Sequence, residues 1–326
     1  MHIRKYKCTL ILAYFGKFHN YFDAFLNTCS YNKNIDFLIF TDNDLVSDYS
    51  NIKIIKMQFD QFAMLFKKKI DSNINLNTPY KLCDFKPTYG FVLSEYLVGS
   101  DYWGVCDCDI IFGDLYKFLE PLFESQYDKI FTLGHLMIFK NTTENNSIFK
   151  DCLNGKCLYK DYLFREEICW FDETYHDDNN INTLFKQKNK KIYDVDMSLN
   201  PRGDYFNFYF NKYYPEMKKY QFTKRKNLVC WEKGLLFNYY IENNKLQKQE
   251  VLYLHLQNRK IINKFDNSDS FVIIPNRILP LKEKIKTKKE FKKHYFKITF
   301  IIDYLRVILF RIKRKLSNNN RKKYRL

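Results

Sequence analysis

The stretch that decides the fold is Tyr102–Leu115, YWGVCDCDIIFGDL. Its apolar residues predict a buried strand, and its centre, Cys106-Asp107-Cys108-Asp109, places two carboxylates and two thiols within four residues. A buried carboxylate without a partner is costly, so Asp107 and Asp109 require a metal ion, a cation or hydrogen bonds. Because successive side chains of a strand point to opposite faces, we expect the carboxylates on one side and the thiols on the other.

The chemistry of these side chains indicates which ion they would bind. Two carboxylates at a strand end form an oxygen-rich site suited to Mg²⁺ or Mn²⁺, ions that often bind substrate phosphates as well. Zinc prefers four thiolate or imidazole ligands, and the cysteine spacing in this chain matches that pattern poorly. An interpretation without a metal is that both aspartates cap the strand end.

The segments before this strand alternate between strand and helix. Apolar, β-rich sequence at Cys8–Tyr14 and Ile35–Phe40 flanks helical spacing at Tyr21–Cys29. Further predicted elements are a strand at Ile52–Met57, a helix at Gln61–Lys69 and a helix from Pro87 to Leu97. The alternation predicts an α/β sheet with helices on its faces, in which ligands bind at the carboxyl ends of strands.

The second half of the chain gives weaker signals. Lys129–Lys140 predicts a strand pair or one bent strand, and Cys169–Phe185 predicts a loop that leads into a helix. Residues 190–240 look irregular and aromatic, and Gln249–Gln257 reads as a late strand. Without an internal repeat or a Gly/Ser-rich linker, residues 1–281 are expected to form one domain.

The positive charge of the chain is concentrated at its carboxyl end. The formal net charge is +17, but residues 282–326 hold 17 basic and three acidic residues, against 37 and 34 in residues 1–281. In residues 288–326 apolar side chains recur at helical spacing between lysines and arginines, which predicts a basic amphipathic helix. Such a helix lies on an anionic membrane surface. The alternative is that the helix caps the core, and we expect no nucleic acid partner because no recognition module accompanies the charge.

Cysteine usage and apolar segments indicate the compartment. The nine cysteines are scattered and odd in number, unlike the paired framework of a small secreted domain. The apolar run Thr9–Phe15 is short and lacks the cleavage site of a signal peptide. Since no apolar stretch approaches the ~20 residues of a spanning helix, we expect a cytoplasmic protein, peripheral on the inner face of the plasma membrane.

Four motifs in a fixed order carry a resemblance to a known family. They are FTDND at 40–44, YKLCDFKPTYG at 80–90, CDCDIIFGD at 106–114 and YLHLQNRK at 253–260. In this order they resemble the metal-dependent nucleotide-sugar glycosyltransferases of the GT-A fold, above all polysaccharide and lipooligosaccharide transferases around families 8 and 32 and related bacterial proteins from capsule and O-antigen clusters. The resemblance implies a Rossmann-like mixed sheet flanked by helices.

The resemblance also implies a donor site for a nucleotide sugar, with a UDP-sugar favoured. Asp109 would be the main ligand of Mn²⁺ or Mg²⁺, Asp107 a ligand that also meets the ribose, and His255 the third ligand. The other implied donor-site residues are Ala13, Tyr14, Phe15, Asp42, Lys86, Arg259 and Lys260. Asp42 is explained equally well as a turn residue. After the histidine the chain departs from the family 8 pattern, which has a glycine and ends in Lys-Pro-Trp.

On the acceptor side the candidates are Gly134 and His135, and the candidate catalytic acids are Asp172 and Glu173. If the reaction inverts the anomeric carbon, one acid takes the proton of the acceptor hydroxyl. If the reaction retains configuration, the donor phosphate can take it and the acids position sugars. Both acids can instead cap a helix or lie in a surface loop.

The predicted function is transfer of a sugar to a glycan in surface polysaccharide biosynthesis. The basic tail favours a lipid-linked acceptor that is presented at the membrane. One alternative is a catalytically inactive, membrane-recruited nucleotide- or glycan-binding protein of the same fold. Another is a nucleotidyltransferase, which is disfavoured because no Gly-rich phosphate loop follows Ile11.

Overall fold

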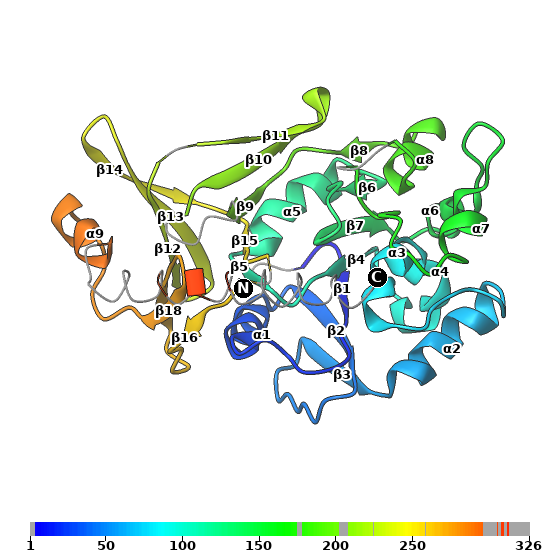
Figure 1. Cartoon of the computed structure of the whole chain (residues 1–326), viewed down its shortest axis with the longest axis horizontal. Coiled ribbons are helices and arrows are strands. Elements are labelled where there is room, and N and C mark those ends of the chain that lie inside the picture. Colours follow the sequence, from blue (N-terminus) through cyan, green and yellow to red (C-terminus); the bar gives the residue numbers. More distant parts are fainter. Residues whose placement is uncertain are drawn as a thin grey trace.

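The computed structural model describes residues 4–174, 178–201, 208–223, 225–257 and 259–295, together with residues 305, 308, 309 and 312. Its centre is a seven-stranded sheet in the order β3-β2-β1-β4-β7-β6-β8 (Figure 1). The strands are β1 (Cys8–Ala13), β2 (Ile35–Thr41), β3 (Ile52–Lys56), β4 (Tyr102–Cys106), β6 (Lys129–Ile130), β7 (Leu136–Lys140) and β8 (Ile192–Tyr193). The first four are parallel and β7 runs antiparallel to β4, so the sheet is mixed.

Helices cover both faces of this sheet because its strands are apolar on both sides. Leu10 of β1 packs into a cluster with α1 (Phe22–Tyr31) and α5 (Leu115–Glu124). Its neighbour Ile11 points the other way, into a cluster with α2 (Phe59–Lys69). Other helices of this half are α6 (Thr143–Ser147), η4 (Ile148–Lys150), α7 (Leu158–Tyr162) and α8 (Ile181–Gln187). The predicted mixed α/β sheet flanked by helices is confirmed, as are the strand pair within 129–140 and the loop and helix within 169–185.

The single helix predicted from Pro87 to Leu97 is wrong. The chain instead makes a series of short helical turns: η1 (Pro79–Lys81), α3 (Leu82–Phe85), η2 (Lys86–Thr88), α4 (Tyr89–Val92) and η3 (Ser94–Leu97). Pro87 has no N–H to donate, so the α-helical ladder gives way to a 3₁₀ turn at this point. Lys86 lies at this irregularity, from which its side chain reaches the end of β4.

The expectation that residues 190–240 are irregular is also wrong. Two further sheets have the orders β11-β10-β9-β15-β5 and β14-β13-β12-β17-β18-β16. Their strands are β5 (Ile110–Phe112), β9 (Ser198–Pro201), β10 (Phe210–Tyr214), β11 (Lys219–Phe222), β12 (Asn227–Glu232), β13 (Leu235–Glu242), β14 (Lys245–Glu250), β15 (Tyr253–His255), β16 (Ile262–Asn263), β17 (Ser270–Ile274) and β18 (Arg277–Pro280), with a 3₁₀ turn η5 (Pro215–Met217). The late strand predicted at 249–257 is the end of β14 and the whole of β15.

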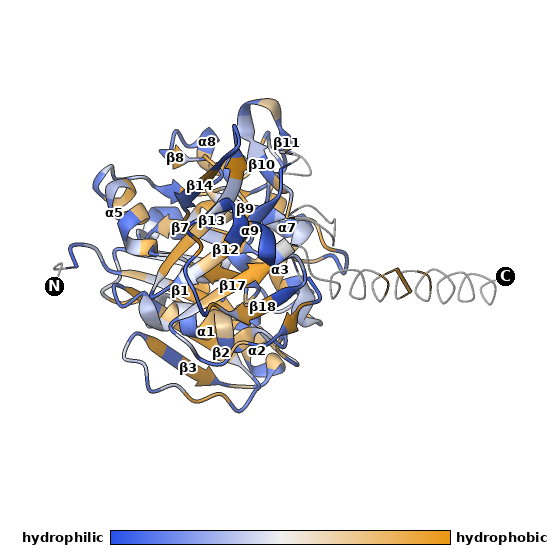
Figure 2. Cartoon of the chain, turned by 90° about the vertical axis from the view of Figure 1, so that its left-hand side faces the viewer, coloured by the Kyte–Doolittle hydropathy of each residue, from blue (hydrophilic) through white to orange (hydrophobic). Residues whose placement is uncertain are grey.

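Helix α9 (Lys288–Tyr295) covers the outer face of the six-stranded sheet. Phe291 is 2% exposed and packs with Ile285 against the β12 and β17 side chains Leu228 and Val272. Figure 2 shows this hydrophilic helix in front of the more hydrophobic strands β12 and β17. The start of the predicted tail helix therefore caps the core, as in the alternative interpretation. Apart from residues 305, 308, 309 and 312, the rest of the tail lies outside the described residues.

One pair of cysteines is bonded, which the sequence analysis did not anticipate. Cys152 and Cys157 form a disulfide within the loop before α7, and the other seven cysteines are free thiols. In the part of the chain that the structure describes, no helix combines the length and apolar character that crossing a membrane requires.

The cap formed by α9 gives a first prediction. Phe291→Ala is expected to lower the free energy of unfolding by about 3–5 kcal/mol, because it leaves a cavity between α9 and the sheet. The exposed neighbour Lys292 provides the control, and Lys292→Ala should change stability little. Urea denaturation of the full chain measures both, and equal midpoints for the two variants would contradict the packing of α9.

Candidate functional site

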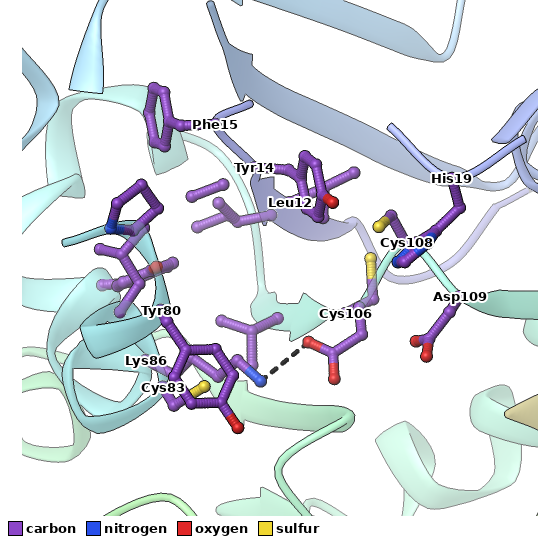
Figure 3. A pocket seen from close by; sticks show the side chains of 17 residues that line it. Leu12, Tyr14, Phe15, His19, Tyr80, Cys83, Lys86, Cys106, Cys108 and Asp109 are labelled. Atoms are coloured by element: carbon purple, nitrogen blue, oxygen red, sulfur yellow. Dashed lines mark hydrogen bonds and ion pairs between the residues drawn. The ribbon is translucent and has the colours of Figure 1, made fainter. Parts of the chain in front are cut away.

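A cavity of about 330 Å³ opens at the carboxyl ends of β1 and β4. From β1 the chain proceeds to β2 and β3 on one side, whereas β4 lies on the other side, so the strand order reverses between β1 and β4. Such a switch point is where open α/β sheets bind ligands. The implied donor-site residues that line this cavity are Ala13, Tyr14, Phe15, Lys86, Asp107 and Asp109 (Figure 3).

The two carboxylates lie in a turn between two sheets. β4 ends at Cys106, and the chain turns through Asp107–Asp109 into β5 of the five-stranded sheet. The continuous strand assumed from the sequence is therefore wrong, although the expected separation of side chains is present. In Figure 3 the thiols of Cys106 and Cys108 point away from the Asp109 carboxylate, and both are buried in the core.

A third candidate ligand comes from the late strand β15. It pairs with β5 so that His255 lies opposite Ile110, and the Leu256 amide donates to the Asp109 carbonyl at 2.7 Å. This pairing brings one possible ligand atom each of Asp107, Asp109 and His255 within 4.8 Å of one another. Nδ1 of His255 is buried and has no hydrogen-bond partner among the described residues. Two carboxylates and one imidazole with an unsatisfied nitrogen fit a divalent cation such as Mn²⁺.

The pKa values of His255 and of its neighbour His135 are shifted in opposite directions. Burial lowers the pKa of His255, but the charge and hydrogen bond of Asp109, whose Oδ1 is 3.4 Å from Nε2, outweigh burial and raise the pKa overall. His135 stacks on His255 with ring centroids 4.2 Å apart, and burial together with the His255 charge holds the pKa of His135 well below its usual range.

His135, predicted to lie on the acceptor side, is buried behind His255. Its side chain is 4% exposed, and Nε2 lies 2.9 Å from the Tyr253 hydroxyl. A ring enclosed by His255 and Tyr253 offers no surface to an acceptor. His135 instead supports the imidazole of His255 from behind.

Lys86 lies between Asp107 of the turn and Asp172, one of the two predicted catalytic acids. Its Nζ donates to Oδ1 of Asp107 and to the Gly134 carbonyl, both at 2.8 Å, and lies 3.5 Å from Oδ2 of Asp172. Burial opposes the charge of Lys86, but Asp107 and Asp172 raise its pKa well above the usual range. The ammonium ion therefore stays charged between the Asp107 carboxylate and the Asp172 carboxyl group.

The predicted catalytic acids differ in exposure. Asp172 is 2% exposed, and burial raises its pKa to about 8 against the opposing effect of Lys86. Glu173 is half-buried. Gly134 lies directly against both acids, since a Cβ at this position would be 2.3 Å from Oδ2 of Asp172. The absence of a side chain at Gly134 is therefore what lets Asp172 approach Lys86.

The remaining predicted donor residues lie less directly at the cavity. The Asp42 carboxylate accepts the Gly16 amide at 2.9 Å and so fixes the loop after β1, consistent with its interpretation as a turn residue. Arg259 is 5% exposed, donates to the Pro275 carbonyl at 3.0 Å and is not among the described residues that line the cavity. Lys260 is exposed.

Comparison with known proteins identifies the family. A family model described as "Family of unknown function (DUF6625)" matches residues 10–282. The chain belongs to this family. No curated protein matches the chain.

Solved structures with partial similarity include three enzymes. The galactosyltransferase LgtC, in complex with donor and acceptor sugar analogs, is 13% identical with a TM-score of 0.33, over 60% of this chain and 76% of that chain. Mouse xyloside xylosyltransferase 1 in its apo form is 8% identical with a TM-score of 0.37, over 61% and 88%. The 4-diphosphocytidyl-2C-methyl-D-erythritol synthase from Anaerococcus prevotii DSM 20548 is 13% identical with a TM-score of 0.33, over 59% and 86%. The resemblance to glycosyltransferase families 8 and 32 stays a prediction, because the matched family has no assigned function.

The sequence analysis missed several residues around the site. His19, Tyr80 and Cys83 also line the cavity. Tyr80 and Cys83 precede Lys86 by six and three residues, a spacing that places all three on one side of consecutive helical turns. Extending the predicted helix back from Pro87 would have found them.

A buried ion pair beside the cavity was missed as well. Nζ of Lys81 lies 2.8 Å from Oδ2 of Asp84, and both side chains are at most 2% exposed. Lys81 also donates to the carbonyls of Tyr162 and Glu167. The pair thus connects the segment that bears Lys86 with the loop that leads to Asp172.

This ion pair gives the second prediction. Asp84→Asn is expected to lower the free energy of unfolding by about 3–5 kcal/mol, because the Lys81 charge stays buried without a counter-charge. Glu124 serves as the control, because it pairs with Lys5 on the surface and Glu124→Gln should leave the urea midpoint nearly unchanged. A small effect of Asp84→Asn would show that the pair does not hold this part of the fold.

Proposed function

We propose that the chain is a metal-dependent glycosyltransferase that moves a sugar from a nucleoside diphosphate sugar, with UDP as the favoured nucleotide, to a glycan acceptor. The observation that carries this proposal is the cluster of Asp107, Asp109 and His255 beside a cavity at the switch point of the sheet. Mn²⁺ or Mg²⁺ is the proposed cofactor, held by these three side chains.

The bound ion would neutralise the diphosphate as its bond to the sugar carbon breaks. The chain's own residues bind and orient the donor. The cavity wall at Ala13–Phe15 accommodates the base and ribose, and Asp107 is positioned by Lys86 at 2.8 Å. Because Lys86 also contacts the Gly134 carbonyl, it fixes the distance between the donor end and the acceptor end of the site.

Among the acids, Glu173 is the proposed group that meets the acceptor hydroxyl. Asp172 is enclosed by Lys86 and Gly134, so its carboxyl positions these groups and does not face an incoming sugar. Glu173 is half-buried on the same turn and can accept a proton within hydrogen-bond reach if the reaction is inverting. In a retaining reaction the same carboxylate would orient the acceptor.

We further propose that the acceptor is lipid-linked, that the pathway is surface polysaccharide biosynthesis, and that the protein works at the cytoplasmic face of the plasma membrane. Residues 296–326 contain ten basic residues and one acid. Leu305, Leu309 and Ile312 are helical and 48–57% exposed, and their spacing places them on one helix face. An exposed apolar face within a basic segment suits an anionic bilayer surface.

The cofactor gives the third prediction. Asp109→Asn is expected to reduce Mn²⁺-dependent hydrolysis of a UDP-sugar to the rate without metal, because it removes a charged ligand while keeping the side-chain shape. The exposed Asp48 provides the control, and Asp48→Asn should be fully active. Release of UDP from a panel of UDP-sugars, with and without chelator, is the measurement.

Three results would overturn the proposed function. Full activity of the Asp109→Asn variant, or full activity of the unmodified protein in excess chelator, would show that the reaction needs no metal at this site. Release of pyrophosphate from a nucleoside triphosphate and a sugar phosphate would identify a nucleotidyltransferase. Absence of any Mn²⁺-dependent binding of nucleoside diphosphates would favour a protein without this catalytic activity.

The tail gives the fourth prediction. Deletion of residues 296–326 keeps α9 on the sheet, and it should abolish sedimentation with phosphatidylglycerol vesicles, since each basic residue near an anionic surface contributes about 1 kcal/mol. Neither protein should sediment with phosphatidylcholine vesicles. Unchanged binding of the shortened chain to the anionic vesicles would rule out the tail as the membrane contact.

A further inference from the structure

Trp170 combines exposure with an unfavourable backbone conformation. The chain has three tryptophans, and Trp103 and Trp231 are fully buried, whereas Trp170 is 43% exposed. Its φ is +54°, in the left-handed region that suits glycine or asparagine and costs free energy for a bulky side chain. A site selected for stability alone would not keep an exposed indole there, and such strain gathers at functional sites.

The buried ion pair holds Trp170 in this conformation. The Asp84 carboxylate accepts the amides of Cys169 at 2.9 Å and Phe171 at 3.1 Å, which are the two residues that flank Trp170. Lys81 neutralises Asp84 and binds the Glu167 carbonyl. The backbone is therefore held by hydrogen bonds on both sides of Trp170.

The same turn carries the proposed acceptor-side acids. The Glu173 amide donates to the Trp170 carbonyl at 3.2 Å, which places Glu173 and Trp170 on one tight turn. Asp172 of this turn reaches Lys86, and through it Asp107, at the mouth of the donor cavity. Trp170 is not among the residues that line that cavity, and the turn that it shares with Glu173 places it next to the proposed acceptor-side acid.

We infer that Trp170 is the platform on which the acceptor sugar stacks. The class of ligand is a neutral pyranose, whose apolar C–H face packs on an indole while its hydroxyl groups stay available to Glu173. A rigid aromatic ring binds such a face with little loss of conformational entropy. This inference rests on the proposed function and names its acceptor-binding residue.

Fluorescence quenching tests the inference directly. Because Trp170 is the exposed tryptophan, acrylamide should quench mainly its emission. In the presence of UDP and Mn²⁺, at least one of glucose, galactose, N-acetylglucosamine and lactose is expected to lower the quenching constant about twofold. Trp170→Ala should lose this protection, and its ratio of sugar transfer to donor hydrolysis should fall at least tenfold, whereas Trp170→Phe should recover most of the ratio.

A glycine substitution distinguishes a role of Trp170 in binding the acceptor from a role in stabilising the fold. Trp170→Gly is expected to raise the urea midpoint by relieving the positive φ, while the ratio of transfer to hydrolysis falls as in Trp170→Ala. Lys233, exposed and at φ +49°, is the matched control, and Lys233→Gly should raise the midpoint without changing the ratio.

The outcomes for the two proposals are distinct. Three results would overturn the platform even where donor hydrolysis is present. In the first, none of the saccharides lowers the acrylamide quenching constant of the unmodified protein. In the others, Trp170→Ala leaves the ratio of transfer to hydrolysis unchanged, or Trp170→Gly lowers the urea midpoint. Absence of Mn²⁺-dependent donor hydrolysis in the unmodified protein would instead overturn the proposed function.

Discussion

The site depends on the contacts that the Lys86 ammonium ion makes with two acids and a backbone carbonyl. Two carboxylates, Asp107 and Asp172, converge on it from different parts of the chain, and the Gly134 carbonyl accepts a third contact. Without this cation, the burial that raises the pKa of Asp172 to about 8 would no longer be opposed by the Lys86 charge, and the Asp172 carboxyl would favour its neutral form more strongly. The position of Lys86 follows from the break in helical structure at Pro87, so a backbone irregularity sets the electrostatics of the site.

The segment at residues 79–97 serves the fold and the site at once. Lys81 and Asp84 point inward and organise the loop at 167–171 through backbone groups. Lys86 points instead to Asp107 in the turn at the end of β4. Short helical turns allow this division, because a regular amphipathic helix would keep charged side chains on its solvent face.

The sequence predicted those parts that local patterns determine. Strands β1 to β4 and the paired acids follow from apolar runs and their spacing. The position of His255 was predicted only through the resemblance, because the ladder between β5 and β15 joins residues more than 140 positions apart. Apart from the late strand at 249–257, the strands after residue 190 were missed, because distant pairing such as that of Val229 with Ile273 stabilises them. The burial of His135 and Arg259, and the positive φ of Trp170, depend on tertiary contacts that residue types do not encode.

The turn at Asp107–Asp109 has a mechanical meaning beyond its chemistry. The Asp107 amide is bonded to the His135 carbonyl, beside the seven-stranded sheet, whereas the Asp109 carbonyl is bonded to the Leu256 amide at the end of β15. The candidate ligands are thus anchored in two different sheets. An ion coordinated by Asp107, Asp109 and His255 would cross-link the two sheets. A change in the phosphates of the proposed donor at this ion would therefore alter contacts in both sheets.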